Sequence, residues 1–213
     1  LIISYQFNKE SFDCNLSPFS YGTLTTIGTR EKLQTEYYVG TGSAQINDNL
    51  YYNIEMNYSQ FNSNKYTFCF WIFLNEECET NKYILYTEYL DPIERRFSLK
   101  YTNDNKLEFI PTAGNSIFSS TKINKNKWYH ITIIIDDSST NDKYLQININ
   151  GVKDIKEIAQ DINFITPKEN NVNIYLGHSN ASYRINGYID DFRIYKTTLD
   201  TQYINTNIIG KIT

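Results

Sequence analysis

Residues 186–200 carry the sequence NGYIDDFRIYKTTLD, which indicates a β-strand that ends in a turn. Successive side chains of a strand point to opposite faces of the sheet. This alternation predicts that one face carries Asp190, Phe192 and Ile194. It predicts that the other face carries Ile189, Asp191, Arg193 and Tyr195. The strand is therefore expected to place one carboxylate, that of Asp190, beside two large apolar side chains.

The environment of Asp190 leaves two interpretations open. A carboxylate on an apolar face needs hydrogen bonds or a cation, because its bare charge is costly in an interior of low dielectric constant. Asp190 is therefore either a ligand of a structural calcium ion or an acceptor of backbone N–H groups at the end of its strand. On the opposite face, Asp191, Arg193 and Tyr195 form either a surface that binds sugar hydroxyls or a solvated face with an ion pair.

Further strand patterns recur at short spacing without intervening helices. The two clearest are residues 66–74, rich in β-branched and aromatic side chains, and residues 128–135. Asn150-Gly151 between two extended runs predicts a tight hairpin, because both central residues of such a turn need positive φ. Shorter strands are expected at residues 3–7, 37–40, 51–56, 83–88, 97–101, 106–110, 144–150 and 172–177. The pattern predicts an all-β sandwich or barrel with one short helix, at residues 200–206 with Asp200 as its N-cap.

Composition narrows the class of protein. A chain of 213 residues fits one all-β domain and can bury a full core. The net charge of −4, with acidic and basic residues interspersed, argues against a nucleic-acid-binding module, which would show a basic stripe. No apolar run approaches the ~20 residues of a membrane span, so membrane insertion is not expected. Because the chain begins at Leu1 rather than Met, residues 1–213 are expected to be a single domain from a larger protein with neighbouring domains.

The three cysteines, Cys14, Cys69 and Cys78, cannot all pair with one another within the chain. Cys69 lies inside an apolar strand and is expected to be a buried thiol. Cys14 and Cys78 lie in loop-like sequence, and both pairing and non-pairing remain open for them.

Eight segments resemble, in order along the chain, the motifs of a laminin-G-like jelly-roll domain of the concanavalin A-like lectin/glucanase superfamily. They are residues 3–7, 13–15, 66–72, 127–131, 144–151, 174–177 and 187–195, followed by Leu199 with the short helix. The resemblance implies an all-β fold, in which two antiparallel sheets pack as a jelly-roll β-sandwich with one short C-terminal helix. Clostridial neurotoxins carry a lectin-like jelly roll of similar Asn- and Ile-rich composition, but the ending IDDFRIY fits laminin-G-like domains better.

The same resemblance implies a metal site. In many of these relatives the loop after the first strand and the Asp of the last strand together form a calcium site. The matching residues are Asp13 and Asp190, whose carboxylates would need backbone carbonyls as further oxygen ligands. Cys14-Asn15 stands where the relatives carry Ser-Gly, which alters the carbonyls that the loop can offer.

The resemblance further implies a non-catalytic recognition module of a secreted or surface protein. Such a module would bind a glycan or a protein through loops at the edge of the sandwich or through its concave face. The expected contacts are Asp191, Arg193 and Tyr195. The aromatic candidates for stacking on sugar rings are Trp71 and Tyr183, with Tyr51, Tyr52 and Tyr58. Because the chain has 19 tyrosines, most must be core or ordinary surface residues.

Two other classes of function are weaker alternatives. One is a structural or assembly domain of a filament, an adhesin or a viral particle. The other is a glycoside hydrolase, which needs two carboxylates flanking the scissile bond. No stretch matches the Glu-x-Asp-x-x-Glu strand of the laminarinase-like group. The sequence places no partner beside His130, so that residue is expected to serve packing or a hydrogen bond, and no catalytic residue is predicted.

Overall fold

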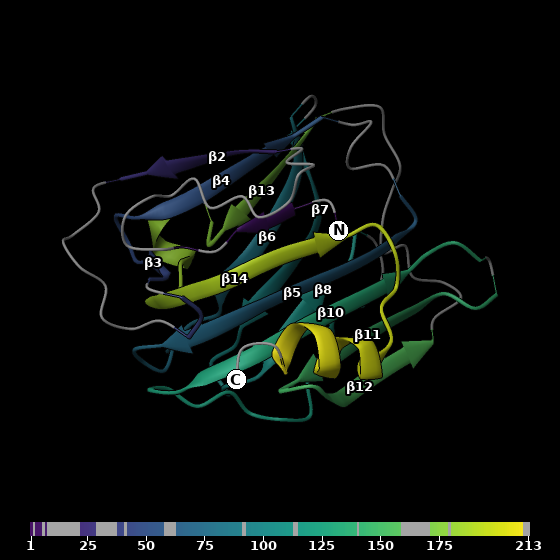
Figure 1. The fold of residues 1–213 in the computed structure, drawn as a ribbon. Helices are drawn as coiled ribbons and strands as arrows, with labels where there is room; N and C mark the ends of the chain where they lie inside the picture. Colours follow the sequence, from purple (N-terminus) through teal and green to yellow (C-terminus); the bar gives the residue numbers. More distant parts are fainter. Residues whose placement is uncertain are drawn as a thin grey trace.

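The computed structural model describes residues 1, 3–5, 7, 22–28, 38–40, 42–57, 63–90, 93–112, 115–139, 141–158, 171–178 and 180–210. Within these ranges the chain forms two antiparallel β-sheets that pack face to face (Figure 1). The predicted two-sheet β-sandwich with a short C-terminal helix is confirmed. None of the helices in these ranges is long and apolar enough to cross a membrane.

The two sheets are named A and B here. Sheet A runs in the order β1 (Ile3–Tyr5), β14 (Gly187–Tyr195), β5 (Lys65–Leu74), β10 (Trp128–Asp136), β11 (Tyr144–Ile149) and β12 (Val152–Ile158), with β3 (Ala44–Ile46) also paired to β14. Sheet B runs in the order β2 (Gly22–Ile27), β4 (Tyr51–Met56), β13 (Val172–Leu176), β6 (Lys82–Leu90), β7 (Ile93–Tyr101), β8 (Leu107–Ile110) and β9 (Ile117–Phe118). Strands far apart in sequence thus become neighbours, as where β13 lies between β4 and β6.

The core between the sheets follows from alternation along the strands. In β4, Tyr52, Ile54 and Met56 are buried in the core cluster, while Glu55 is exposed. Burying each such side chain stabilises the fold by about 1.5–3 kcal/mol. Strand β5 is different, because nearly all of its side chains are buried on both faces, as predicted for a central strand.

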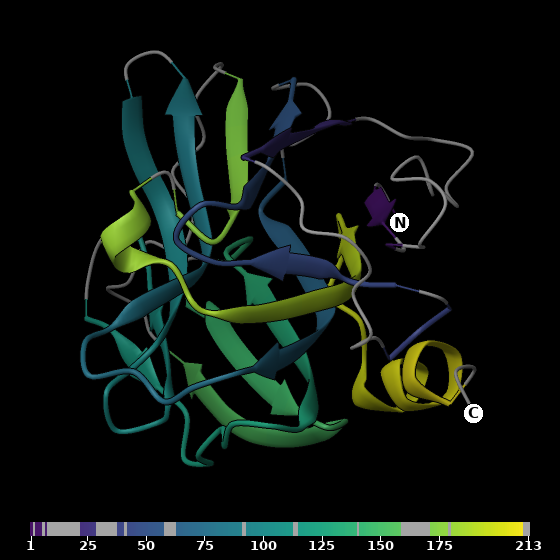
Figure 2. The same ribbon diagram turned by 90° about the vertical axis from the view of Figure 1, so that its left-hand side faces the viewer.

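The C-terminal segment covers part of the outer face of sheet A. Asp200 is the N-cap of helix α1 (Thr201–Ile204), and its side chain accepts a hydrogen bond from the Tyr203 N–H at 2.7 Å. The π-helix η2 (Asn205–Ile209) continues α1. Ile204 and Ile208 pack in a second hydrophobic cluster with Cys69, Ile134 and Tyr195. Figure 2 shows this segment on the side of sheet A that faces away from sheet B.

The predicted Asn150-Gly151 hairpin is confirmed, with φ of 51° and 73° joining β11 to β12. The prediction of a strand at residues 37–40 is wrong for residues 38–40, which the structure describes as a bend and turn. Cys69 is a buried free thiol as predicted, and Cys78 is a half-buried free thiol. Cys14 lies outside the described residues.

The prediction for the two faces of β14 is wrong because the strand contains a bulge. Its pairing with β5 shifts register between Asp190 and Arg193, and Asp191 adopts a φ of 48°. A bulge inserts one extra residue and so reverses the alternation beyond it. Ile189 and Phe192 therefore both point into the core between the sheets. Asp190 and Asp191 are buried, with exposed fractions of 0% and 1%.

Candidate functional site

Asp190, the predicted calcium ligand, is bound by backbone N–H groups. Its Oδ2 accepts hydrogen bonds from Tyr38 N at 3.0 Å and Val39 N at 2.7 Å, and its Oδ1 accepts one from Asp191 N at 2.7 Å. Burial raises the pKa of Asp190 to about 7, although the three N–H donors oppose the rise. The structure thus favours the second interpretation from the sequence, a carboxylate that satisfies backbone donors.

The three N–H groups around Asp190 cannot themselves ligate a cation, so a calcium ion there would need further oxygen ligands. No group of three or more His, Cys, Asp or Glu residues within the described ranges is placed to hold a metal ion. Asp13, the second predicted ligand, lies outside those ranges. The calcium site therefore stays a prediction.

Asp191, Arg193 and Tyr195 do come together, but not on an open surface. Arg193 Nε donates to Asp191 Oδ1 at 2.8 Å, and the Arg193 side chain, which is 18% exposed, also bonds Tyr195. Burial lowers the pKa of Arg193, but Asp191 and Tyr195 raise it by more. Tyr195 is 6% exposed and packs against the C-terminal helix. This face of β14 is therefore largely buried in the structure, and contact of its residues with a partner stays a prediction.

Trp71, another predicted contact, is also covered. Its exposed fraction is 4%, and the Tyr38 ring stacks on it with 3.5 Å between ring centroids. The Trp71 ring also meets the His130 ring edge-on, with 5.0 Å between the ring centroids. His130 is buried, which lowers its pKa to about 3, with Arg193 adding to the effect, so its ring is neutral at pH 7. This agrees with the packing role expected for His130.

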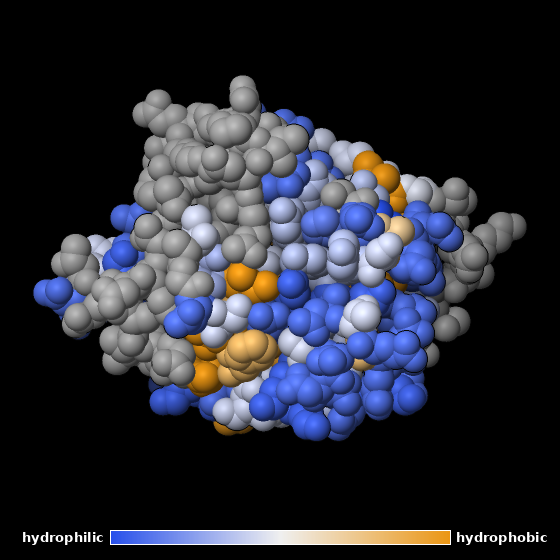
Figure 3. Space-filling model, turned by 180° about the vertical axis from the view of Figure 1, so that it is seen from behind, coloured by the Kyte–Doolittle hydropathy of each residue, from blue (hydrophilic) through white to orange (hydrophobic). Residues whose placement is uncertain are grey.

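The outer face of sheet B has a different character. Figure 3 shows the molecule from this side, where hydrophilic and intermediate residues cover most of the coloured surface and hydrophobic ones form small groups. Alternation in β13 explains the pattern, because Ile174 and Leu176 point into the core while Asn173 and Tyr175 point outward.

Tyrosine side chains from three neighbouring strands and the following loop gather on this face. We call the cluster the tyrosine surface, and its members are Tyr51 of β4, Tyr83 and Tyr86 of β6, Tyr175 of β13, and His178 and Tyr183 after β13. The rings follow one another across the face. The distance between ring centroids is 6.1 Å from Tyr51 to Tyr175 and 6.3 Å from Tyr175 to Tyr86. It is 4.3 Å from Tyr86 to His178, 4.6 Å from His178 to Tyr83 and 6.2 Å from Tyr83 to Tyr183. Tyr183, in the 3₁₀ turn η1 (Ala181–Tyr183), is 47% exposed, and the others are partly exposed.

A chain of polar side chains runs beside these rings. Asn53 Nδ2 donates to Asn173 Oδ1 at 3.1 Å, and Asn173 Nδ2 donates to the Tyr175 hydroxyl at 3.1 Å. The Tyr175 hydroxyl in turn donates to Glu88 Oε1 at 2.9 Å. Burial raises the pKa of Glu88, and the Tyr175 hydrogen bond offsets part of the rise. The face therefore combines flat aromatic rings with amide, hydroxyl and carboxyl groups.

His178 links the strands to the loop that carries Tyr183. Its Nδ1 accepts a hydrogen bond from the Asn180 N–H at 2.9 Å, which assigns the ring proton of the neutral imidazole to Nε2. Burial lowers the pKa of His178, and the nearby cations Arg184 and Lys100 lower it further. His178 is therefore a neutral aromatic member of the tyrosine surface at pH 7.

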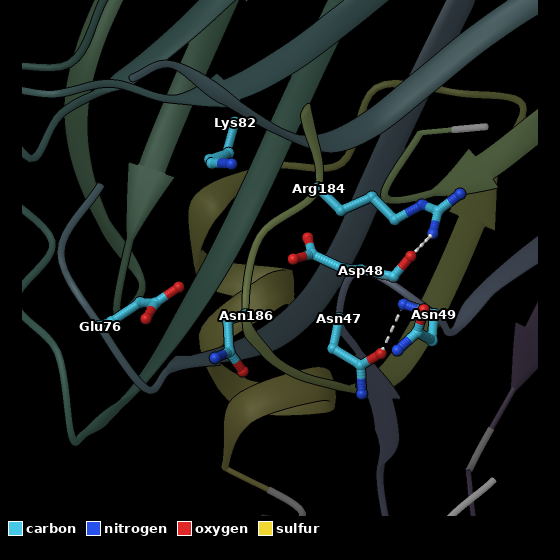
Figure 4. A pocket seen from close by; sticks show the side chains of 7 residues that line it. All are labelled: Asn47, Asp48, Asn49, Glu76, Lys82, Arg184 and Asn186. Carbon is cyan, nitrogen blue, oxygen red and sulfur yellow. Dashed lines mark hydrogen bonds between the residues drawn. The ribbon is translucent and has the colours of Figure 1, made fainter. Parts of the chain in front are cut away.

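A polar cavity of about 250 Å³, which we call the edge pocket, opens where turns and loops meet at the end of the strands (Figure 4). It is lined by Asn47, Asp48, Asn49, Glu76, Lys82, Arg184 and Asn186. Arg184 connects the pocket to the tyrosine surface, because its guanidinium lies over the Tyr51 ring at 4.1 Å. Its Nε donates to the His178 carbonyl at 2.5 Å, and its guanidinium also donates to the Asp48 carbonyl.

Sequence reasoning found part of this surface. Tyr51 and Tyr183 were stacking candidates and lie on it, whereas Tyr52 is in the core and Tyr58 is outside the described residues. It missed Tyr86, Tyr175 and the edge pocket. The outward position of Tyr175 in β13 follows from alternation, but its proximity to β6 depends on the strand order.

Comparisons with known proteins agree with this fold. The receptor-binding domain of botulinum neurotoxin mosaic serotype C/D has a TM-score of 0.73 at 18% identity, covering 99% of this chain and 50% of that one. The ligand-binding domain of serotype D neurotoxin, solved in complex with N-acetylneuraminic acid, gives a TM-score of 0.68 at 18% identity over 99% and 50% of the two chains. This chain thus spans about half the length of these toxin domains.

A third similar structure has the same extent as this chain. It is domain 4 of AbnA, an extracellular arabinanase from Geobacillus stearothermophilus, in complex with arabinotriose, with a TM-score of 0.65, 18% identity and 97% coverage of both chains. The search of curated proteins found no match. A family model, Concanavalin A-like lectin/glucanases superfamily, matches residues 40–205. The eight motifs, the two-sheet jelly roll and this match together show that the chain belongs to the concanavalin A-like lectin/glucanase superfamily.

Proposed function

We propose that this domain is a non-catalytic recognition module that binds glycans on the tyrosine surface. The observation that carries the proposal is the continuous set of partly exposed rings from Tyr51 to Tyr183, next to the Asn53–Asn173–Tyr175–Glu88 hydrogen-bond chain. Aromatic rings offer flat apolar faces to the C–H groups of a sugar, and the neighbouring polar groups offer partners to its hydroxyls. In this proposal the domain works in a secreted or surface-exposed protein.

The structural neighbours give the proposal its class of ligand. One neighbour was solved with arabinotriose and another with N-acetylneuraminic acid, and both ligands are sugars. A further neighbour, the binding domain of botulinum neurotoxin DC, was solved in complex with rat synaptotagmin II, which makes a protein ligand the second candidate. The assembly alternative has less support, because large exposed hydrophobic side chains such as Ile27, Phe118 and Val152 lie on separate strands.

Replacing Tyr86 or Tyr175 by alanine should weaken binding of arabinotriose by roughly tenfold, because each change removes a ring from the middle of the tyrosine surface. Isothermal titration calorimetry measures the effect. Tyr203→Ala is the matched control, since Tyr203 is 43% exposed on helix α1 over the other sheet and should leave the affinity unchanged. Unchanged affinity in both surface variants would count against the proposal, as would release of free arabinose during incubation, which would indicate a hydrolase.

A structural calcium ion held by Asp13 and Asp190 is a separate proposal. A ligand that binds only the folded state raises its stability. If the site exists, adding calcium should raise the melting temperature above its value in chelator. An Asp190→Asn variant should then lose the increase, and an identical melting temperature of the unaltered protein under both conditions would rule the site out.

A further inference from the structure

The edge pocket has a lining made entirely of hydrogen-bonding side chains. Two are carboxylates (Asp48 and Glu76), two are cations (Lys82 and Arg184), and three are amides (Asn47, Asn49 and Asn186). A ligand that fills the pocket must therefore present polar groups around its perimeter, because an unpartnered polar group is costly once it is shielded from water. The volume of about 250 Å³ lies just below the range of drug-sized sites, which suits a single sugar ring.

The cations of the pocket are already engaged with backbone carbonyls. Lys82 Nζ donates to the Ser182 carbonyl at 2.9 Å. Arg184 donates to the carbonyls of His178 and Asp48 and rests on the Tyr51 ring. Lys82 therefore ties Ser182 to β6, and Arg184 ties its own loop to His178 and to the turn at Asp48.

The two carboxylates of the pocket, those of Asp48 and Glu76, are not engaged in this way. Both residues are exposed, and within the described part of the chain no hydrogen bond engages either carboxylate, since the Arg184 bond at Asp48 goes to its main-chain oxygen. The Asp48 charge still acts on Arg184, because it raises the pKa of the guanidinium against the effect of burial. Figure 4 shows the two carboxylates on opposite sides of the pocket, with Asn186 between them. The pocket thus has an imbalance, because its two carboxylates accept no described hydrogen bond whereas both of its cations already donate to carbonyls.

From this imbalance we infer that the edge pocket holds one unit of a neutral oligosaccharide and discriminates against acidic sugars. Hydroxyl groups of the sugar donate to the Asp48 and Glu76 carboxylates, and the three amides pair with the remaining hydroxyls. The carboxylate of an acidic sugar can neither donate a hydrogen bond to Asp48 or Glu76 nor lie beside them without repulsion between like charges. The rest of the glycan continues past the exposed Tyr183 ring onto the tyrosine surface, so this inference rests on the proposed function.

The test is a binding comparison of neutral and acidic glycans on one array, followed by calorimetry with the tightest neutral binder and with N-acetylneuraminic acid. The unaltered protein should bind neutral glycans and should bind N-acetylneuraminic acid at least about tenfold more weakly. Asp48→Asn and Glu76→Gln should each lower the affinity for the neutral glycan by about tenfold, since each removes a charge-assisted hydrogen bond while keeping the shape of the side chain.

Asp142→Asn is the matched control. Asp142 is exposed in the turn between β10 and β11, near the Lys65 end of β5, whereas Glu76 follows the opposite end of that strand. The Asp142→Asn variant should bind the neutral glycan with the same affinity as the unaltered protein. If Tyr175→Ala weakens glycan binding but Asp48→Asn and Glu76→Gln do not, the pocket inference fails and the proposed function stands. A preference for N-acetylneuraminic acid also overturns the inference, and the absence of any glycan binding overturns both.

Discussion

Replacing Asp190 by alanine should lower the free energy of unfolding by about 3 kcal/mol or more. The change leaves three backbone N–H groups without their acceptor, a buried one at Asp191 and two part-buried ones at Tyr38 and Val39. An unsatisfied buried donor costs about 1–3 kcal/mol. The change also frees the segment that holds Tyr38 against Trp71. Urea unfolding monitored by tryptophan fluorescence measures the loss.

Asp200→Ala is the control for this variant, because it removes another Asp side chain that accepts a backbone N–H, at the exposed N-cap of α1. It should cost only about 1 kcal/mol. Equal losses for the two variants would contradict the structural role assigned to Asp190.

The raised pKa of the Asp190 carboxyl should also make the free energy of unfolding depend on pH. Burial raises its pKa to about 7 in the folded protein, whereas an unfolded chain has an Asp pKa of about 3.9. Between these values the folded state binds more protons than the unfolded state, so the contribution of Asp190 to stability falls as the pH rises from about 4 to 7. Asp190→Asn, which cannot titrate, should lose this part of the pH dependence when unfolding is compared at the two ends of the window.

Replacing Arg193 by methionine should destabilise the protein by about 3–5 kcal/mol, because it leaves the Asp191 carboxylate buried without its cation. Adding Asp191→Asn to the same chain should recover much of the loss, since asparagine carries no charge and tolerates the positive φ at this position. A double-mutant cycle of urea unfolding measures the coupling between the two residues.

Lys65→Met is the control for Arg193→Met. It also removes the cation of an ion pair, with Asp136 at 2.9 Å, but the Lys65 side chain is 42% exposed. Its effect should be much smaller than that of Arg193→Met, because solvent screens the exposed lysine and Asp136 keeps its hydrogen bonds from Ser138. A loss in Arg193→Met no larger than that in Lys65→Met would contradict the buried pair.

The strands of the core could be predicted from the sequence because their signals are local. Strand β5 combines β-branched and aromatic residues over its whole length, and the Asn150-Gly151 turn needs only two neighbouring residues. The signal for the N-cap at Asp200 is also local, because it depends only on Asp200 and the residues that follow it. The edge strands β2 and β3 were missed, because β2 is rich in partly exposed threonine and β3 has only three residues.

The candidate site was harder to predict, for two physical reasons. The bulge at Asp190 and Asp191 reverses the side-chain alternation, and a sequence of alternating polar and apolar residues carries no sign of one extra residue. The tyrosine surface depends on the order of β4, β13 and β6, which brings Tyr51, Tyr175 and Tyr86 together. Strand order is set by long-range packing, so the individual tyrosines could be read from the chain but their assembly could not.

The most direct test of glycan recognition by the tyrosine surface is a two-dimensional NMR titration of the domain with arabinotriose, including the aromatic resonances. The account predicts saturable shifts for Tyr86, Tyr175 and His178 of the tyrosine surface, with Trp71 and Arg193 on sheet A unchanged. Shifts confined to sheet A, or a spectrum that does not change, would contradict it.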